Sequence, residues 1–218
     1  MTKLSGPMVP PKSGGAPRQV VVLLHGYGSD GADLIGLGPY WRDQLPDALF
    51  VAPNGPAPCR INSTGYQWFD VDPDRPEFRL EGAAQARPVI AEFLGDLWTQ
   101  TGLGPEDTIL VGFSQGAMMA LHVALTLDKP LMGVIGFSGL LIAPAGFADY
   151  AGPKPPICLV HGELDGVVPC DMSAQATAAL KAQGFDVRFH ISPGAPHTIT
   201  PDGLAFASDF IATVSATV

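Results

Sequence analysis

Short, continuously apolar segments alternate along this chain with segments of helical periodicity. Strands that are buried on both faces read as unbroken aliphatic runs, and they occur in parallel sheets that helices cover on both sides. The alternation therefore predicts an α/β fold with a mostly parallel central sheet and helices on both faces. The expected strands are residues 20–24, 48–52, 108–112, 131–137, 157–160 and 187–191, and the expected helices are residues 82–101, 117–127, 173–183 and 203–214.

The length and the connections predict how this fold is organised. The chain has 218 residues, and it shows no internal repeat or change of composition that would mark a second domain. We expect one domain over residues 18–218, preceded by a flexible N-terminal segment, residues 1–17, which is rich in Gly, Pro and Ser. The connection over residues 139–156 is too short for a cap domain. The long connection over residues 54–80 contains aromatic residues, so we expect it to be ordered and functional.

Acidic residues outnumber basic ones, with 21 Asp and Glu against 12 Lys and Arg and a formal net charge of −9. This balance argues against binding to nucleic acid and to an anionic membrane surface, and it favours small or apolar substrates. The longest aliphatic run, residues 20–24, is far shorter than the roughly 20 residues that cross a bilayer. The N-terminus lacks the apolar core of a signal peptide. We therefore expect no membrane span and a cytoplasmic location.

The cysteines and histidines do not form a recognisable metal motif. Cys59, Cys158 and Cys170 are an odd number at wide spacing, which fits neither a disulfide framework nor a C-x-x-C site. We interpret them as free thiols in a reducing compartment. The sequence also lacks an H-E-x-x-H motif, so metal-dependent hydrolysis is not expected.

The sequence Gly-Phe-Ser-Gln-Gly at residues 112–116 matches the G-x-S-x-G pattern of a nucleophile elbow, a strained turn from a strand into a helix. An expected strand precedes it and an expected helix follows it. Its glycines leave room where side chains would collide with neighbouring backbone. A similar segment at residues 136–139 lacks the second glycine, because Leu140 stands there. We therefore predict that Ser114 is a nucleophile; the alternative is an ordinary serine at a helix N-terminus.

The acidic partner should lie between this serine and a later histidine, because hydrolases with such an elbow follow that chain order. Only Glu163 and Asp165 directly follow an expected buried strand, where the sites of parallel sheets form. Asp165 lies deeper in the loop, just before Gly-Val-Val-Pro, and is our prediction for the acid. Glu163 is the alternative, and a solvated loop acid without a catalytic role is the other interpretation.

Five histidines compete for the role of general base. His197 follows the last expected strand in a Pro- and Gly-rich loop, which can direct an imidazole toward Ser114, and it completes the chain order. His25 and His161 precede glycine at strand ends and are interpreted as structural. His122 is expected to be packed or partly exposed on a helix, and His190 to lie on a strand.

These residue types together predict acyl transfer. A serine hydroxyl becomes a good nucleophile when His197 removes its proton, while Asp165 orients the imidazole and stabilises its protonated form. The oxyanion that develops needs two preorganised donors. We predict that these are the backbone N–H groups of Gln115, which follows the nucleophile, and of Tyr27, in the loop after the first long strand.

Several segments, in this order, resemble the phospholipase/carboxylesterase family of the α/β-hydrolase fold, which includes the acyl-protein thioesterases. The resemblance covers about residues 18–216 and implies an α/β-hydrolase fold without a cap domain and without a cofactor. It also implies cleavage of carboxylic esters or thioesters with an apolar acyl or aryl part, and a possible homodimer. The thioesterases carry leucine where this chain has Tyr27, so the carboxylesterase branch fits better. The matching segments are residues 25–28 with 33–34, 68–70, 112–116, 137–140, 161–169 and 193–197.

Apolar residues near the expected active face are candidates for substrate contacts. We predict pocket roles for Trp68, Leu140 and Val167, since ester pockets are mostly apolar. The alternative for such residues is plain core packing.

The leading functional hypothesis is a serine carboxylesterase acting on a small-molecule ester, with short- to medium-chain or aryl groups. An acyl-protein thioesterase or a lysophospholipase is the enzymatic alternative. A remote alternative is a non-catalytic ligand-binding protein on the same fold, because fold alone does not establish function.

Overall fold

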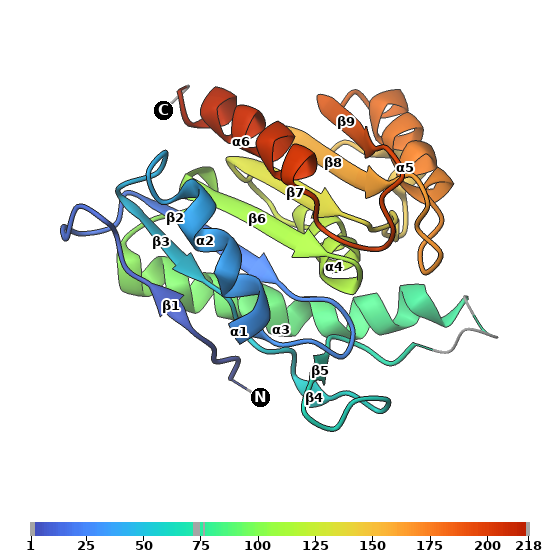
Figure 1. The fold of residues 1–218 in the computed structure, drawn as a ribbon, viewed down its shortest axis with the longest axis horizontal. Coiled ribbons are helices and arrows are strands. Elements are labelled where there is room, and N and C mark those ends of the chain that lie inside the picture. Colours follow the sequence, from blue (N-terminus) through green and yellow to red (C-terminus); the bar gives the residue numbers. More distant parts are fainter. Residues whose placement is uncertain (1–2, 72–74, 76, 217–218) are drawn as a thin grey trace.

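The computed structural model describes residues 3–71, 75 and 77–216. Its centre is a seven-stranded sheet with the strand order β1-β3-β2-β6-β7-β8-β9 (Figure 1). Neighbouring strands run parallel except for β1 and β3. The predicted mostly parallel sheet is therefore confirmed. The strands are β1 (Met8–Val9), β2 (Gln19–Leu24), β3 (Ala48–Val51), β6 (Thr108–Phe113), β7 (Gly133–Phe137), β8 (Ile157–Gly162) and β9 (Val187–Ser192).

Strand β2 shows why the apolar runs are continuous. Its residues Val20 to Leu24 are all 0% exposed. Successive side chains point to opposite faces of a sheet, so Val20 and Val22 pack into one core cluster while Val21 and Leu23 pack into the other. Because both faces are covered, no position of the run is left for a polar side chain.

Helices lie on both sides of the sheet (Figure 1). The helices of the first cluster are α3 (Phe78–Thr101), α4 (Gln115–Ala124) and α5 (Asp171–Ala182); those of the second are α1 (Gly31–Leu34), α2 (Gly38–Trp41) and α6 (Pro201–Ser215). Helices α3 to α6 correspond to the four expected helices. Helices α1 and α2, with the 3-10 turn η1 (Ile35–Leu37) between them, were missed because elements of about one turn are too short to show periodicity.

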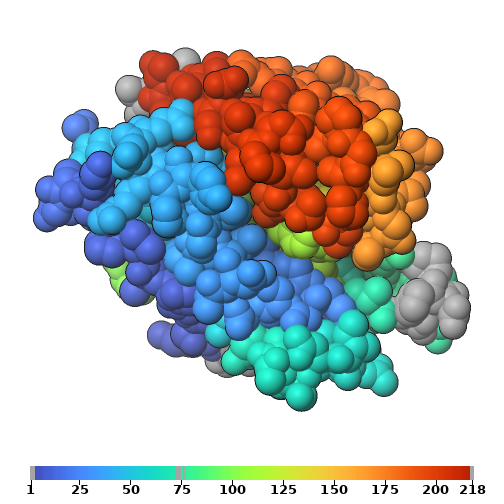
Figure 2. All heavy atoms as spheres, in the orientation of Figure 1, coloured from blue at the N-terminus to red at the C-terminus, as the bar shows by residue number. Residues whose placement is uncertain are grey.

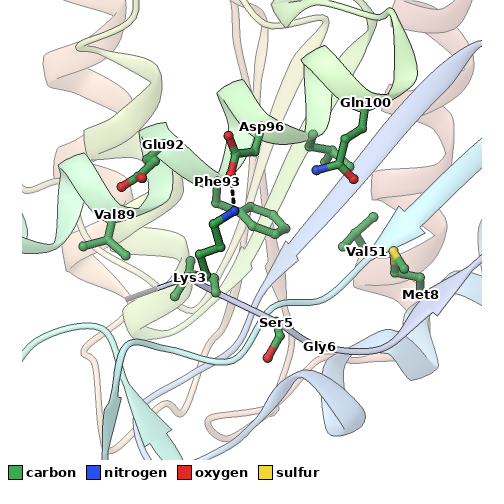
Figure 3. A pocket seen from close by; sticks show the side chains of 12 residues that line it. Lys3, Ser5, Gly6, Met8, Val51, Val89, Glu92, Phe93, Asp96 and Gln100 are labelled. Atoms are coloured by element: carbon green, nitrogen blue, oxygen red, sulfur yellow. Dashed lines mark ion pairs between the residues drawn. The ribbon is translucent and has the colours of Figure 1, made fainter. Parts of the chain in front are cut away.

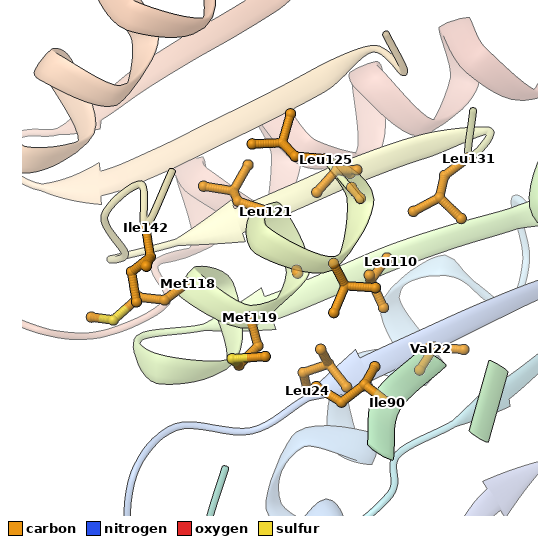
Figure 4. Packing of buried hydrophobic residues seen from close by; sticks show 14 of the residues in the cluster. Val22, Leu24, Ile90, Leu110, Met118, Met119, Leu121, Leu125, Leu131 and Ile142 are labelled. Carbon is orange, nitrogen blue, oxygen red and sulfur yellow. The ribbon is translucent and has the colours of Figure 1, made fainter. Parts of the chain in front are cut away.

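Helix α4 is buried along its whole length. Figure 4 shows its side chains against the sheet and against α3, where Met119 lies beside Leu24 and Ile90. A helix that is apolar all round belongs inside the protein. This packing holds the first turn of α4, and therefore the strand-to-helix turn before it, in a fixed position.

The structure differs from the sequence prediction at the N-terminus. Residues 1–17 were expected to be a flexible segment, but Met8–Val9 form β1, with Met8 opposite Val51 of β3. The backbone N–H of Asn54 also donates to the carbonyl oxygen of Ser5 at 2.9 Å. An edge strand of this length shows no periodicity, so only its pairing reveals it.

The two long connections, residues 54–80 and 139–156, differ in structure. The longer one forms a hairpin of β4 (Ala57–Pro58) and β5 (Tyr66–Gln67) before α3 begins at Phe78. The connection over residues 139–156 contains only the 3-10 turn η3 (Phe147–Asp149), so no cap domain is inserted at this point of the chain. A third 3-10 turn, η2 (Pro105–Asp107), leads into β6. Among the described residues, no helix is long and apolar enough to cross a membrane.

Candidate active site

Ser114 occupies the turn between β6 and α4. Its backbone has φ 54° and ψ −115°, a conformation that non-glycine residues rarely adopt. A Cβ at Gly112 would collide with the backbone of Gly116, and a Cβ at Gly116 would collide with the carbonyl oxygen of Leu24. The two glycines therefore permit the close approach of strand and helix that this turn requires. Ser114 itself is 9% exposed, which leaves its side chain accessible at the carboxyl end of the sheet.

The similar segment after β7 shows that a strained serine alone does not define a nucleophile. Ser138 also has a positive φ, 51°. However, Ser138 is 0% exposed, and within the described part of the chain its hydroxyl has no hydrogen-bond partner. The difference in exposure favours Ser114 over Ser138 as the nucleophile. The missing second glycine after Ser138 favours the same serine.

The structure brings Asp165 and His197 together across 32 residues of chain. The Nδ1 of His197 lies 2.6 Å from Oδ2 of Asp165. The Asp165 side chain is fully buried, and its Oδ1 accepts hydrogen bonds from the backbone N–H groups of Val167 at 2.9 Å and Val168 at 2.8 Å. Burial by itself would raise the pKa of Asp165, but the hydrogen bonds from His197 and from these two N–H groups outweigh it, so the pKa is lowered. The carboxylate is therefore ionised and oriented.

The alternative acid, Glu163, has a different partner. Its Oε2 accepts a hydrogen bond of 2.7 Å from the backbone N–H of Gly194. This contact braces the loop that carries His197 but does not reach the imidazole. Of the two acids that the sequence left open, the structure places Asp165 against His197.

His197 lies beside the strand-to-helix turn. Its ring packs on that of Phe113, with 4.9 Å between the ring centroids, and Phe113 directly precedes Ser114. The hydrogen bonds of the described residues do not include one between the Ser114 hydroxyl and His197. In many hydrolases such a bond is long until substrate is bound.

The loop after β2 lies directly against Ser114. A Cβ at Gly26 would sit 3.4 Å from the Cβ of Ser114 and 3.1 Å from the Phe113 ring. The Gly26–Tyr27 peptide is therefore next to the nucleophile candidate, where the second oxyanion donor was predicted.

The β4–β5 hairpin holds this loop. Gly28, with φ 82°, donates its N–H to the carbonyl oxygen of Tyr66 at 2.9 Å. The side-chain amide of Asn62 donates to the carbonyl oxygen of Gly28 at 2.7 Å. His25 anchors the start of the loop, since its Nε2 accepts the N–H of Gly55 at 2.9 Å. Burial lowers the pKa of His25, so it is neutral and structural, as its sequence position indicated.

Trp68 is found beneath the same loop. It is 3% exposed, and its indole N–H donates to the carbonyl oxygen of His25 at 2.8 Å. Its backbone N–H donates to Oε1 of Gln115 at 3.0 Å, and the Nε2 of Gln115 donates to the carbonyl oxygen of Phe69 at 2.7 Å. Trp68 thus links the two segments that carry the predicted oxyanion donors. Sequence reasoning used only the backbone of Gln115 and missed this role of its side chain.

The remaining histidines are held elsewhere or by other partners. The Nδ1 of His122 donates to the carbonyl oxygen of Ile142 at 2.7 Å, and burial lowers the pKa of His122. His190 pairs with Asp202 at 2.7 Å. His161 was interpreted as structural, but its Nε2 lies 3.1 Å from the same Asp165 oxygen that His197 contacts.

A cavity of about 280 Å³ adjoins His197. It does not include the predicted pocket residues: Leu140 is half-buried against the first core cluster, and Val167 is 70% exposed. In Figure 2, the yellow-green middle segment of the chain is visible between the blue and red segments on this face. Leu34 and Leu37 were missed because their short helical elements were not foreseen. The lining residues are Asp33, Leu34, Leu37, Phe113, His197, Thr198 and Ile199.

A second cavity, of about 260 Å³, lies between the N-terminal segment and α3 (Figure 3). Lys3 and Asp96 form an ion pair of 4.0 Å there. It contains none of the predicted site residues. The described residues also contain no group of three or more His, Cys, Asp or Glu side chains placed to hold a metal ion.

A family model described as phospholipase/carboxylesterase matches residues 9–215. The chain belongs to this family. The esterase YpfH of Escherichia coli strain K12 is 30% identical over 194 residues, which cover 89% of this chain and 82% of that protein. Acyl-protein thioesterase 1 of Gibberella zeae is 28% identical over 207 residues, covering 88% of each chain.

Solved structures agree with this membership of the phospholipase/carboxylesterase family. The crystal structure of esterase PE8 superposes with a TM-score of 0.93 and 55% sequence identity, covering 97% of this chain and 99% of that one. The chain therefore has the predicted α/β-hydrolase fold, and it is a carboxylic ester hydrolase.

Proposed function

We propose that this hydrolase is a serine carboxylesterase that uses Ser114, His197 and Asp165 as its catalytic triad. The observation that supports this most directly is the 2.6 Å contact between His197 Nδ1 and the buried Asp165 carboxylate. It occurs next to Phe113, which precedes Ser114, the less buried of the two serines with positive φ. A carboxylate on Nδ1 leaves Nε2 free to accept the serine proton, as triad chemistry requires.

The reaction would proceed through an acyl-enzyme. His197 takes the Ser114 proton while Oγ attacks the ester carbonyl, and the imidazolium then gives that proton to the leaving alkoxide. The N–H groups of Gln115 and Tyr27 would stabilise the oxyanion, each contributing about 2.7–4 kcal/mol to lowering the barrier. Water, activated by His197, then attacks the acyl-enzyme and releases the acid and Ser114.

The substrates proposed are short- to medium-chain or aryl esters. The cavity beside His197 is lined by apolar side chains, including Leu34 and Ile199, and by polar ones in about equal measure. Its volume of about 280 Å³ is just below the range of roughly 300–1,000 Å³ for small-molecule sites, which suits a small ester. Trp68, Leu140 and Val167 stay predictions as substrate contacts.

Burst kinetics test the proposal. With p-nitrophenyl acetate, we expect a burst of p-nitrophenol close to one equivalent per enzyme if deacylation limits turnover, and covalent labelling of Ser114 by a fluorophosphonate. Ser114→Ala should lose both, with a fall in kcat of about 10⁴-fold or more. Ser138→Ala is the matched control and should keep labelling. Unchanged turnover in Ser114→Ala, or absence of labelling in the wild type, would refute the assignment of Ser114 as the nucleophile.

Thioester hydrolysis is the second candidate, because acyl-protein thioesterase 1 of Gibberella zeae is similar over most of the chain. The higher identity to esterase PE8 favours the oxygen ester. Comparing kcat/KM on an ester and a thioester with the same acyl chain decides between them. Including a lysophospholipid in the same assay tests the lysophospholipase alternative.

The homodimer and the cytoplasmic location also stay proposals. Sedimentation velocity at micromolar concentration tests the first, and fractionation of cells that express the tagged chain tests the second.

A further inference from the structure

His161 is buried at the end of β8, below the loop that carries Asp165. Its side chain is 0% exposed. The Nε2 lies 2.8 Å from the carbonyl oxygen of Val168 and 3.1 Å from Oδ2 of Asp165. A polar ring that is removed from water in this way must satisfy both of its nitrogens inside the protein.

The neighbours determine where a proton of this ring resides. A carbonyl oxygen and an ionised carboxylate can only accept hydrogen bonds, so Nε2 of His161 must carry a proton. The Nδ1 lies 2.7 Å from Oγ of Ser173, and the same Oγ lies 2.9 Å from the carbonyl oxygen of Gly139. Both ring nitrogens therefore have partners, and the ring cannot rotate without losing them.

This arrangement completes the surroundings of Asp165. Its Oδ1 accepts two backbone N–H groups. Its Oδ2 lies 2.6 Å from Nδ1 of His197 on one side and 3.1 Å from Nε2 of His161 on the other. The two hydrogen bonds and the two imidazole rings together restrict the orientation of the carboxylate. Oδ2, the oxygen that must meet His197, is the one that His161 holds.

The support for His161 comes from a different part of the fold. Ser173 lies on α5 and is 1% exposed, and Gly139 lies in the loop after β7. A buried chain of contacts therefore joins the loop beside Ser114 to Asp165: a Cβ at Gly139 would lie 3.4 Å from the carbonyl oxygen of Ser114. The contacts of Gly139, Ser173 and His161 therefore connect the loop beside Ser114 to Asp165.

We infer that His161 is a positioning residue for catalysis, which acts by holding Oδ2 of Asp165 in the place where it orients His197. Ser173 positions His161 in turn. The inference rests on the proposed function, because it gives Asp165 and His197 their triad roles. His161 itself touches neither the substrate nor the reacting atoms.

The first test compares His161→Leu with His161→Gln. Leucine removes the donor, and we expect kcat to fall about 10- to 100-fold with KM within about twofold, since misplacement of a catalytic group affects the chemical step. Glutamine keeps an N–H donor and should restore kcat to within about fivefold of the wild type. His122→Leu is the matched control: it removes another buried histidine that makes one hydrogen bond, to Ile142. It should lower the melting temperature but leave kcat unchanged.

Ser173→Ala gives an independent measurement if His161→Leu does not fold. It replaces one small side chain by another and removes the partner of Nδ1, so we expect kcat to fall about 3- to 10-fold, again without a change in KM.

The inference is overturned if His161→Leu, or Ser173→Ala, keeps the wild-type kcat. It is also overturned if glutamine and leucine at position 161 lower kcat equally, because a donor would then not matter. Fluorophosphonate labelling of Ser114 separates this failure from that of the proposed function. A wild-type enzyme that labels, together with an unaffected His161 variant, refutes only the positioning role.

Discussion

The side chain of Gln115 accepts a 3.0 Å hydrogen bond from the backbone N–H of Trp68, and the indole of Trp68 reaches the carbonyl oxygen of His25 at 2.8 Å. One glutamine side chain therefore couples the first turn of α4 to the loop after β2. These two segments carry the proposed oxyanion donors. Their separation is consequently set by buried hydrogen bonds that do not take part in the reaction.

Removing that side chain should disturb the site while leaving its backbone donors in place. In Gln115→Ala, the Trp68 N–H and the Phe69 carbonyl oxygen lose their partners, and each buried unpaired group costs about 1–3 kcal/mol. We expect a lower melting temperature and a fall in kcat of about tenfold. Gln183→Ala is the control, since it removes an exposed hydrogen bond to Ala148. Equal behaviour of the two variants would contradict this role of Gln115.

Replacing each candidate acid by its amide tests which one serves His197. Asp165→Asn keeps the shape but loses the charge that stabilises the imidazolium, and we expect kcat to fall by about 10⁴-fold, as the same change does in a serine protease triad. Glu163→Gln weakens only the contact to the loop N–H of Gly194 and should cost less than about tenfold. The measurement is kcat with p-nitrophenyl acetate. A larger loss in Glu163→Gln would assign the acid to Glu163.

Glycine at position 116 is required by its close approach to Leu24. In Gly116→Ala, the new Cβ overlaps the Leu24 carbonyl oxygen, so we expect destabilisation by more than about 3 kcal/mol or no soluble protein. Gly95→Ala is the matched control, because a Cβ there meets nothing within 4 Å. Alanine in the middle of α3 should raise the free energy of unfolding by about 0.5–1 kcal/mol. Urea unfolding compares the two, and a stable Gly116→Ala protein would disagree with the packing.

Acid should weaken the contact between His190 and Asp202. The hydrogen bond from His190 holds the pKa of Asp202 well below its usual value of 3.8. A carboxyl whose pKa is lowered by folding adds stability above its unfolded pKa, and this contribution is lost as the pH falls below about 4. The free energy of unfolding of the wild type should therefore exceed that of Asp202→Asn by more at pH 5 than at pH 3. Equal differences at the two pH values would show that the contact is not coupled to protonation.

Filling the cavity beside His197 should change substrate preference. Leu37→Trp adds volume to its lining, so we expect kcat/KM for a p-nitrophenyl ester with a bulky acyl or aryl group to fall about tenfold, while the acetate ester is hydrolysed at the wild-type rate. Leu80→Trp, at a position that is 45% exposed on α3, is the control. If both esters are affected equally in Leu37→Trp, the substrate does not enter this cavity.

The parts of the site that depend on neighbours in the chain could be read from the sequence. The glycines at 112 and 116 reveal the strand-to-helix turn because they lie only four positions apart, directly after a strand whose aliphatic run is visible in the sequence. A Cβ at Gly112 would collide with Gly116 itself. Trp68 shows the opposite case. Its hydrogen bonds under the loop after β2 could not be predicted, because they depend on Gln115 and His25, which are remote in the chain.

The pattern of buried aliphatic runs specifies the parallel sheet and its two covered faces, because a strand buried on both sides is aliphatic at every position, whatever it packs against. Pairing between distant segments produces no comparable pattern in the sequence. Asp165 and Glu163 are two residues apart and chemically alike, and only the packing of their loop brings one to His197 and the other to Gly194. The β1 edge strand and the contact of His161 with Asp165 were settled in the same way, by three-dimensional proximity.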